Sequence, residues 1–393
     1  MESNISVYAE LRSYIRTISV AVSLPSLSDS STRLTVAADG LNVRVSHHGE
    51  TRQLRLPGKT SLGVASLPAQ KQGVPIVEWR LPLSPESASQ DSALQETTQL
   101  WSATDLEAGS SAECKKCGAT VVKDGAVAWK DLPSENWAEM MDFWHCHKPA
   151  DHGHSHDHSH GGKADEASLA ARGYGASSTI SAQDGIGFVD LTTLLFSESD
   201  CQGLTFSLSG FEQGSTNRED LMETQSHSLN VFCSSCQTQL GFFNFRAAAV
   251  TLLKWQVSCK SASGILPDVS ECLAATISST IARSGSSKSL IIPVAGSSEK
   301  ADQVIHVWVM LSRGIVYSTS AVEGCTPAIK LFYQLISQEE ADKMLEEIMC
   351  DAQEINLPVS GIKDVIGHLE DSNILLPASE RRFKDWKVGL LKR

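Results

Sequence analysis

Short stretches in which apolar and polar residues alternate run through most of the chain and predict strands. Residues 33–45 alternate in this way around Asp39-Gly40, a dipeptide typical of a tight hairpin turn. Further stretches of this kind follow, often ended by Gly or Pro; they are 53–56, 61–64, 74–83, 187–196, 204–208, 227–232, 239–245, 249–257, 290–294, 305–311, 315–320 and 328–335. This pattern predicts a β-rich protein built mainly from antiparallel sheets.

Helical spacing of apolar residues is confined to a few segments. Residues 269–283 form one amphipathic stretch, and 338–349 form another, which follows Ser337 as the expected N-cap and has an acidic first turn. A last helix is expected over 358–368, and one more after Ser134, where Trp137, Met140, Met141 and Trp144 recur at helical spacing. We therefore expect an α+β fold with few helices.

Two stretches of low apolar content divide the chain. Residues 83–111 are rich in Ser, Gln, Glu and Ala and predict a long loop. In 151–162, His152, His154, His156, His158 and His160 alternate with Gly, Ser and Asp, which is typical of a flexible loop that extends to about residue 178. This tract is either a metal store or a solvated loop that binds metal weakly. The expected segments are a β-rich domain (1–112), a cysteine-containing segment (113–150), the His-rich loop (151–178) and an α+β domain (179–393).

Composition argues against some classes of partner and indicates the cellular compartment. The chain has 33 Lys and Arg against 46 Asp and Glu, a net charge of −13, which argues against nucleic acid as a direct partner. No apolar run approaches the roughly 20 residues of a membrane span, and the N-terminus has no signal-peptide pattern. We therefore expect a cytoplasmic or nuclear protein, in which ten cysteines point to metal binding rather than to disulfides.

Two Cys-x-x-Cys pairs carry the strongest chemical signal. Cys114 and Cys117 form the first pair, and Cys233 and Cys236 form the second, about 115 residues later. Two cysteines at this spacing can bind one metal ion from a single turn, and two such turns complete a tetrahedral zinc shell. Gly118 and Gly241 follow the pairs and could supply the positive φ of such turns. The sequence predicts one structural zinc that connects two distant stretches of the chain and so joins the two parts of the α+β fold; the alternative is four unrelated free thiols.

Two further groups could carry chemistry. Cys146 and His147, next to Trp144 and His145, could bind a second zinc or a partner's metal, or could simply end a helix in solvent. Among the remaining cysteines, Cys325 is expected in an exposed turn and is the candidate nucleophile, although no neighbouring His and Asp pattern marks a catalytic cysteine.

The order of these motifs resembles that of a known family. Cys114-x-x-Cys117-Gly118 is followed by Leu132-Pro-Ser-Glu-Asn-Trp137, Trp144-His-Cys-His147, Cys233-x-x-Cys236 and Ala328-Ile-Lys-Leu-Phe-Tyr333. This order resembles the HECT-like ubiquitin ligases that bind a ubiquitin-conjugating enzyme. The resemblance implies a ubiquitin-protein transferase that docks the conjugating enzyme, accepts ubiquitin or assists its transfer, and modifies lysines of a target.

The resemblance also implies a docking surface over 240–257, with Phe242, Phe243 and Trp255 as partner contacts; from pattern alone this stretch could equally be paired core strands. The C-terminal lobe pattern of authentic HECT ligases is absent from the sequence, which puts a covalent ubiquitin intermediate in question.

The same resemblance implies a rival function in mRNA 3′-end processing. The segment 133–147 is similar to a motif that plugs a metallo-β-lactamase-type endonuclease. In that hypothesis the chain is a non-catalytic binding protein or chaperone. Trp137 and Trp144 would anchor the segment, and Cys146 and His147 would approach the metals of the nuclease.

Overall fold

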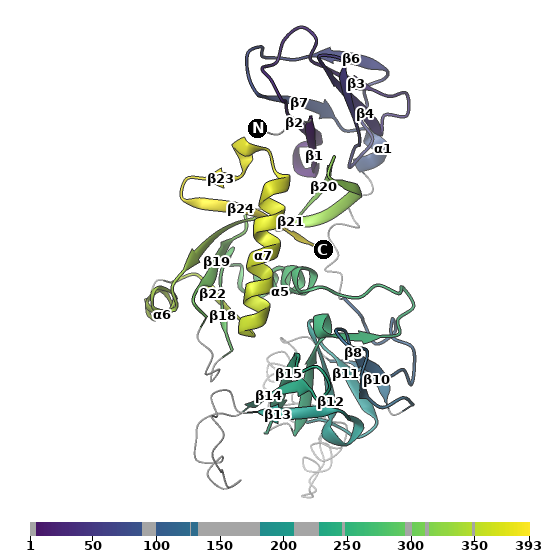
Figure 1. Ribbon diagram of the computed structural model, residues 1–393, viewed down its shortest axis with the longest axis vertical. Helices are drawn as coiled ribbons and strands as arrows, with labels where there is room; N and C mark the ends of the chain where they lie inside the picture. The colour runs from purple at the N-terminus through teal and green to yellow at the C-terminus, as the bar shows by residue number, and fades with distance from the viewer. Residues whose placement is uncertain are drawn as a thin grey trace, which may run out of the picture. The chain divides into compact units, whose positions relative to one another are not determined.

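The computed structural model describes residues 5–88, 100–125, 127–132, 181–207, 228–245, 248–294, 301–310, 314–347 and 350–393. Strands predominate within these ranges, which confirms the β-rich prediction (Figure 1). The chain forms two compact units: unit 1 comprises Met1–Thr98, Val269–Ala295 and Lys300–Arg393, and unit 2 comprises Gln99–Asp268 with Gly296–Glu299. This division differs from the segments expected from the sequence, because both ends of the chain belong to the same unit.

A large sheet forms the centre of unit 1. Its strands are β1 Ser6–Arg12, β2 Thr17–Ser23, β7 Ile76–Pro82, β18 Lys288–Pro293, β19 Val304–Trp308, β20 Ile315–Thr319, β21 Val322–Ile336, β22 Gln353–Leu357, β23 Arg382–Phe383 and β24 Trp386–Lys392. The order is β22-β18-β19-β21-β20-β1-β2-β7, and β24 pairs with both β21 and β23. Most pairs are antiparallel, but β18 and β22 run parallel. The N-terminal strand β1 pairs with β20, so residues about 310 positions apart lie side by side.

A second sheet packs on β1, β2 and β7 to form a sandwich within unit 1. It has the order β5-β4-β3-β6, with β3 Arg33–Val36, β4 Asn42–His47, β5 Glu50–Arg55 and β6 Ala65–Pro68. The inward residues of both sheets share one core, in which Trp79 is the largest side chain, and its indole N–H donates to the Pro68 carbonyl. Burying the ring while satisfying its N–H is the arrangement expected for a core tryptophan.

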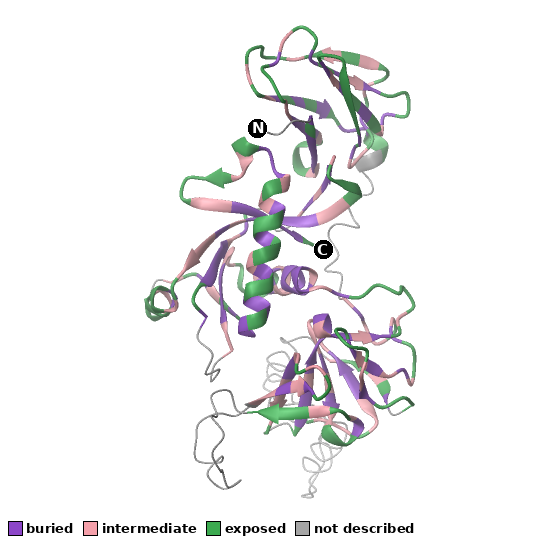
Figure 2. Ribbon diagram, in the orientation of Figure 1, coloured by how far each residue is buried: buried purple, intermediate pink, exposed green. Residues whose placement is uncertain are grey.

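Helices cover part of the large sheet of unit 1. The helices α5 Val269–Ser284 and α7 Val359–Leu375 pack on β24 and on each other, and α7 alternates buried and exposed positions (Figure 2). Helix α6 Gln338–Glu346 begins after Ser337, whose hydroxyl accepts the Glu340 N–H, as the sequence predicts. The only other α-helix among the described residues is the single turn α1, Pro85–Ala88.

Unit 2 consists of two sheets around one core. The larger sheet has the order β10-β11-β12-β16-β15-β14-β13, and the smaller β17-β8-β9. Their bounds are β8 Ala112–Cys114, β9 Thr120–Val122, β10 Ala128–Asp131, β11 Ile186–Val189, β12 Thr193–Ser197, β13 Leu204–Ser207, β14 Ser228–Cys233, β15 Gln239–Asn244, β16 Ala249–Leu253 and β17 Val257–Cys259. Lys254 is fully buried, and its ammonium donates to the carbonyls of Leu100, Trp101 and Leu191.

Several predicted strands need correction. Residues 61–64 do not form a strand; β6 lies just after them. The predicted strand 187–196 is a hairpin of β11 and β12, and 249–257 is broken by a turn of 3-10 helix at Lys254–Gln256. The turn at Asp39-Gly40 is confirmed, with Gly40 at a φ of 66°. No helix of the described residues is long and apolar enough to span a membrane.

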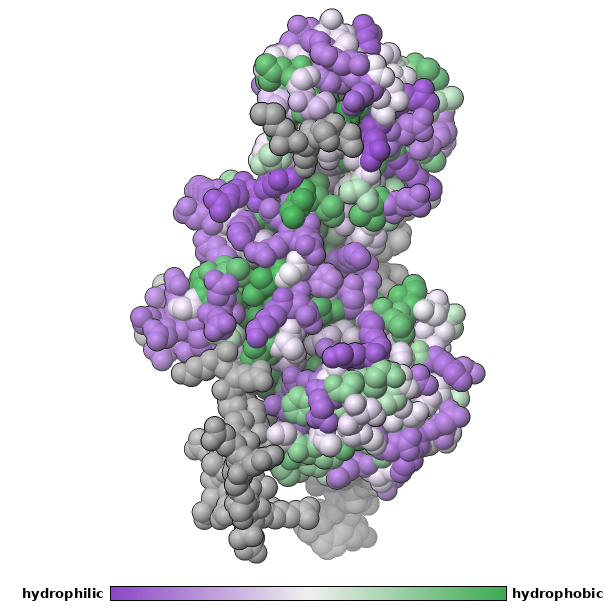
Figure 3. All heavy atoms as spheres, viewed as in Figure 1, coloured by the Kyte–Doolittle hydropathy of each residue, from purple (hydrophilic) through white to green (hydrophobic). Residues whose placement is uncertain are grey.

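Surface hydropathy is mixed on the side of the molecule that Figure 3 shows. There, the described hydrophobic residues lie in separate groups among a hydrophilic majority.

Candidate metal centre

Two hairpin turns of unit 2 carry the four cysteines. Cys114 ends β8, and Cys117 lies in the turn to β9; Cys233 ends β14, and Cys236 lies in the turn to β15. We call these turns the first and second knuckles, residues 114–119 and 233–238. Both sheets of unit 2 therefore contribute one knuckle to the same place.

The backbones of the two knuckles match bond for bond. In the first, the N–H of Gly118 donates to the carbonyl of Cys114, and the N–H of Cys114 donates to that of Ala119. In the second, the N–H of Gln237 donates to the carbonyl of Cys233, and the N–H of Cys233 donates to the carbonyl of Thr238. Such turns aim free amides toward the cysteine sulfurs, which favours thiolates over thiols.

The four sulfurs lie close enough to share one ion. Cys114 Sγ is 3.6 Å from Cys236 Sγ, and Cys117 Sγ is 3.6 Å from Cys233 Sγ. All four lie within 4.8 Å of one another. A tetrahedral centre with Zn–S bonds of about 2.3 Å has sulfurs roughly 3.8 Å apart. The four thiols could therefore hold one metal ion with little movement.

The thiols of the two knuckles differ in pKa. Burial raises the pKa of the Cys114 thiol to about 12, whereas hydrogen bonds from the Thr238 hydroxyl and backbone lower the pKa of Cys236 to about 6. Cys114 and Cys233 are fully buried in the core of unit 2, and Cys117 is exposed. Binding an ion would release the thiol protons, so occupancy should fall as pH decreases.

The arrangement suits a structural ion. Four protein sulfurs complete a tetrahedral shell and leave no position for substrate. All four cysteines lie in unit 2, which corrects one prediction: the centre joins two hairpins of the same unit rather than two separate parts of the molecule.

The two glycines noted in the sequence have different roles. Gly118 has a φ of 71°, as predicted, but the matching residue of the second knuckle is Gln237, with a φ of 57°. Gly241 does not have a positive φ; a Cβ there would lie 1.9 Å from the Thr251 carbonyl oxygen. Position 241 therefore requires glycine because β15 and β16 lie too close together there for a side chain.

Cys325 lies in β21 rather than in a turn. It is exposed, its Sγ lies 3.4 Å from the Leu56 carbonyl oxygen, and partial burial raises the pKa of its thiol. Burial also raises the pKa values of Cys201 and Cys259, to about 12 in each case. None of these three thiols has the lowered pKa that marks a nucleophilic cysteine.

The expected docking stretch is only partly exposed. Trp255 is 6% exposed and Leu252 is fully buried, so both belong to the core of unit 2. Phe242 and Phe243 are half-buried. Phe243 packs edge-on against Phe206 and Phe245, with ring centroids 5.6 and 5.3 Å away. Phe206, which lies in β13, and Phe245 are 37% and 48% exposed. We call Phe206, Phe243 and Phe245 the phenylalanine cluster; Phe245 is its exposed member from the expected docking stretch.

Other predicted site residues lie outside the described part of the chain. They are Trp137, Trp144, Cys146, His147 and the His-rich tract. Sequence reasoning also missed one cluster of metal-binding residue types, Asp29, His47 and His48 in unit 1. Its only signal in the sequence was the His-His-Gly run, which starts at the last residue of β4.

Comparisons with known proteins identify the same family that the order of motifs resembles. A family model described as "HECT-like Ubiquitin-conjugating enzyme (E2)-binding" matches residues 10–388. An uncharacterized protein of Schizosaccharomyces pombe is 26% identical over 301 residues, which cover 75% of this chain and 77% of that protein. An uncharacterized protein of Saccharomyces cerevisiae is 23% identical over 318 residues, or 80% and 79% of the two chains. No solved structure matches.

Proposed function

The chain belongs to the HECT-like ubiquitin-conjugating enzyme (E2)-binding family, and from that premise we propose that it is a ubiquitin-protein ligase that docks a conjugating enzyme and promotes ubiquitin transfer to target lysines. The observation that carries this proposal is the extent of the family match, residues 10–388, which includes strands of both units and both knuckles.

The proposed ion of the Cys₄ centre is zinc. Four thiolates in a tetrahedral arrangement suit zinc, which has no redox chemistry of its own and stabilises small hairpins in this way. In unit 2 it would fix the turn from which β15 starts, and β15 carries Phe243 of the phenylalanine cluster. Zinc would thus act on function through the position of this strand.

The phenylalanine cluster is the proposed docking surface for the conjugating enzyme. Exposed aromatic rings that pack on an ordered sheet can contribute strongly to a protein interface, because they bury a large area at low entropic cost. The two exposed rings flank a half-buried one, so the cluster is anchored to the core of unit 2.

The environment of Cys325 supports direct transfer. In this route the target lysine amine attacks the thioester carbonyl of the charged conjugating enzyme, the amide forms, and the enzyme's thiol leaves with the proton. No cysteine of this chain takes part. The covalent route would need Cys325 as a thiolate, and its raised pKa and its contact with the Leu56 carbonyl oppose that form.

Binding to conjugating enzymes tests the docking step. Phe245→Ala should weaken the affinity of the zinc-loaded chain for its conjugating enzyme by about thirtyfold or more, since truncating an interface hot spot costs at least about 2 kcal/mol. Phe383→Ala is the matched control, because Phe383 is 44% exposed but lies in unit 1. Equal affinity of both variants would refute the docking surface, whereas failure of the unaltered chain to bind any conjugating enzyme would refute the function itself.

Discharge of a charged conjugating enzyme tests the transfer step. The chain should speed the loss of the thioester when a lysine acceptor is present, and Cys325→Ala should discharge at the same rate. A reducible ubiquitin adduct on the chain that Cys325→Ala removes would instead establish the covalent route. Co-purification with a metallo-β-lactamase-type endonuclease, without any conjugating enzyme, would favour the rival function.

A further inference from the structure

The β3–β4 hairpin of unit 1 brings two histidines next to an aspartate. Arg33 pairs with Ser46, so the loop before β3 lies beside the residues that follow Ser46. Asp29 lies in that loop, His47 ends β4, and His48 begins the turn to β5. One possible ligand atom from each of the three residues lies within 4.8 Å of the other two.

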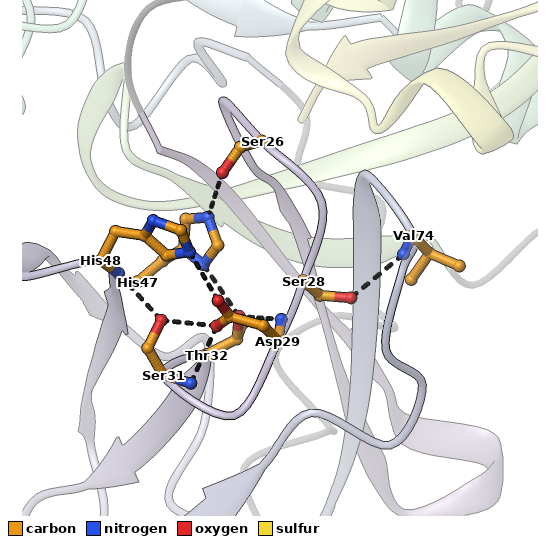
Figure 4. Close-up of polar contacts among 8 residues, drawn as sticks. All are labelled: Ser26, Ser28, Asp29, Ser31, Thr32, His47, His48 and Val74. Atoms are coloured by element: carbon orange, nitrogen blue, oxygen red, sulfur yellow. Dashed lines mark hydrogen bonds and ion pairs between the residues drawn. The ribbon is translucent and has the colours of Figure 1, made fainter.

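Hydrogen bonds hold the aspartate and His48 in place (Figure 4). Asp29 Oδ1 accepts the backbone N–H and the hydroxyl of Ser31, at 2.8 and 2.6 Å. Its other oxygen, Oδ2, lies 2.7 Å from His48 Nε2. Ser31 Oγ in turn accepts the His48 N–H. One carboxylate oxygen is thus fixed by the loop, while the other is directed at an imidazole.

His47 is the buried member of the group. It is 1% exposed, and its two ring nitrogens lie 2.8 Å from the hydroxyls of Ser26 and Thr32. The two histidine rings are 4.2 Å apart between centroids. An ion would take the place of one hydroxyl at His47, and the other hydroxyl would continue to orient the ring, as a second-shell partner of a metal-bound histidine does.

The turn between β4 and β5 sets the position of the His48 imidazole. His48 and Gly49 are the two central residues of the β4–β5 turn and have φ values of 48° and 86°. Two-residue turns with both φ values positive strongly favour Asn-Gly. Histidine is one of the few residues with a side chain that also occupy positive φ, and here it places an imidazole against Asp29.

We propose that Asp29, His47 and His48 form a binding site for a divalent transition-metal ion, with Zn²⁺ and Co²⁺ as suitable probes. Two imidazoles and one carboxylate suit such ions, and three protein ligands leave a position open for water or another ligand. The site is open to solvent, because the side chains of His48 and Asp29 are 56% and 46% exposed. In these respects it differs from the closed Cys₄ centre.

Calorimetric titration with Zn²⁺ tests the proposal in the full chain, loaded beforehand with one zinc per molecule. Serine replaces the five histidines of the tract, His152, His154, His156, His158 and His160, so that they do not compete for the ion. This parent is compared with His48→Asn, which keeps the residue that the turn prefers, and with Asp29→Asn. We expect the parent to bind one more equivalent than either variant, or to bind it at least tenfold more tightly.

Co²⁺ identifies the ligands of that extra equivalent. Its visible spectrum should show nitrogen and oxygen ligands without the sulfur-to-cobalt charge-transfer band of a thiolate site. Because asparagine suits the turn, His48→Asn without added metal should unfold at the same temperature as the parent or higher. Equal metal binding by the parent and a folded His48→Asn variant would overturn the proposal.

Discussion

At the scale of single residues, the two knuckles differ at one position where the backbone needs a left-handed residue. Gly118 fills it in the first knuckle, and Gln237 fills it in the second. The left-handed conformation costs a residue with a Cβ roughly 1–2 kcal/mol, and glycine avoids that cost.

Gln237→Gly should therefore stabilise unit 2, by about 1 kcal/mol once the lost contact between the Gln237 amide and the Ser234 carbonyl is allowed for. The reciprocal variant, Gly118→Gln, should destabilise unit 2 by a similar amount. Chemical denaturation of the zinc-loaded protein measures both. Two changes of the same sign would show that the φ values do not govern the stability of the knuckles.

At the scale of elements, β15 and β16 approach each other so closely at Gly241 that β15 has no room for a side chain there. Gly241→Ala would place a Cβ against the backbone of β16, where it can be accepted only if the strands separate. We expect a loss of about 3 kcal/mol or more in the free energy of unfolding.

Gly367→Ala in α7 is the control for this variant, because a Cβ there meets nothing within 4 Å. It should stabilise the helix by up to about 1 kcal/mol. Thermal unfolding of both proteins compares the two outcomes. A Gly241→Ala variant as stable as the unaltered chain would show that β15 and β16 can move apart freely.

A partly buried ionic network joins three elements of unit 1. Lys330 of β21 lies 2.6 Å from the carboxylates of Glu10 in β1 and Glu380 in the 3-10 turn Ala378–Glu380. Burial alone would raise the pKa of Glu10, but the attraction of Lys330 and Arg12 outweighs it, and the net shift is downward.

A lowered pKa in the folded state means that Glu10 stabilises the fold above its unfolded value, near 4.5, and loses this contribution as pH falls through the folded pKa. Glu10→Gln should reduce stability at pH 7 by about 2 kcal/mol, because it leaves the partly buried Lys330 ammonium with one carboxylate partner instead of two. It should also flatten the dependence of the unfolding free energy on pH below about 5. Denaturation between pH 3 and 7 tests this; an unchanged slope would contradict it.

At the scale of the whole molecule, the two units have separate cores, and only unit 2 contains the Cys₄ centre. A chelator that removes the proposed zinc should therefore destabilise unit 2 by several kcal/mol, since structural zinc contributes about 10–16 kcal/mol of binding free energy near pH 7. Amide hydrogen exchange should show β8, β9, β14 and β15 losing protection while β1, β2 and β7 keep theirs. Equal loss of protection in both sets of strands would rule out a local role for the ion.

The sequence by itself determined the local elements and the chemistry of the Cys₄ centre. Asp39-Gly40 specifies its hairpin turn, Ser337 caps α6, and the helical periodicity after residue 268 marks α5, because these features depend on neighbouring residues alone. The two Cys-x-x-Cys pairs predicted one shared metal site, and the distances between the four sulfurs support this prediction. Strands β1, β2 and β24 were missed because buried central strands lack the alternation that marks a half-exposed strand.

Tertiary structure alone decided which distant segments meet. The pairing of β1 with β20, together with that of β24 with β21, places both ends of the chain in unit 1, and no local pattern encodes a contact across about 310 residues. The same holds for the burial of Trp255, the space that excludes a side chain at Gly241 and the approach of Asp29 to His48. Each depends on packing and strand register between segments, which residue type and spacing do not specify.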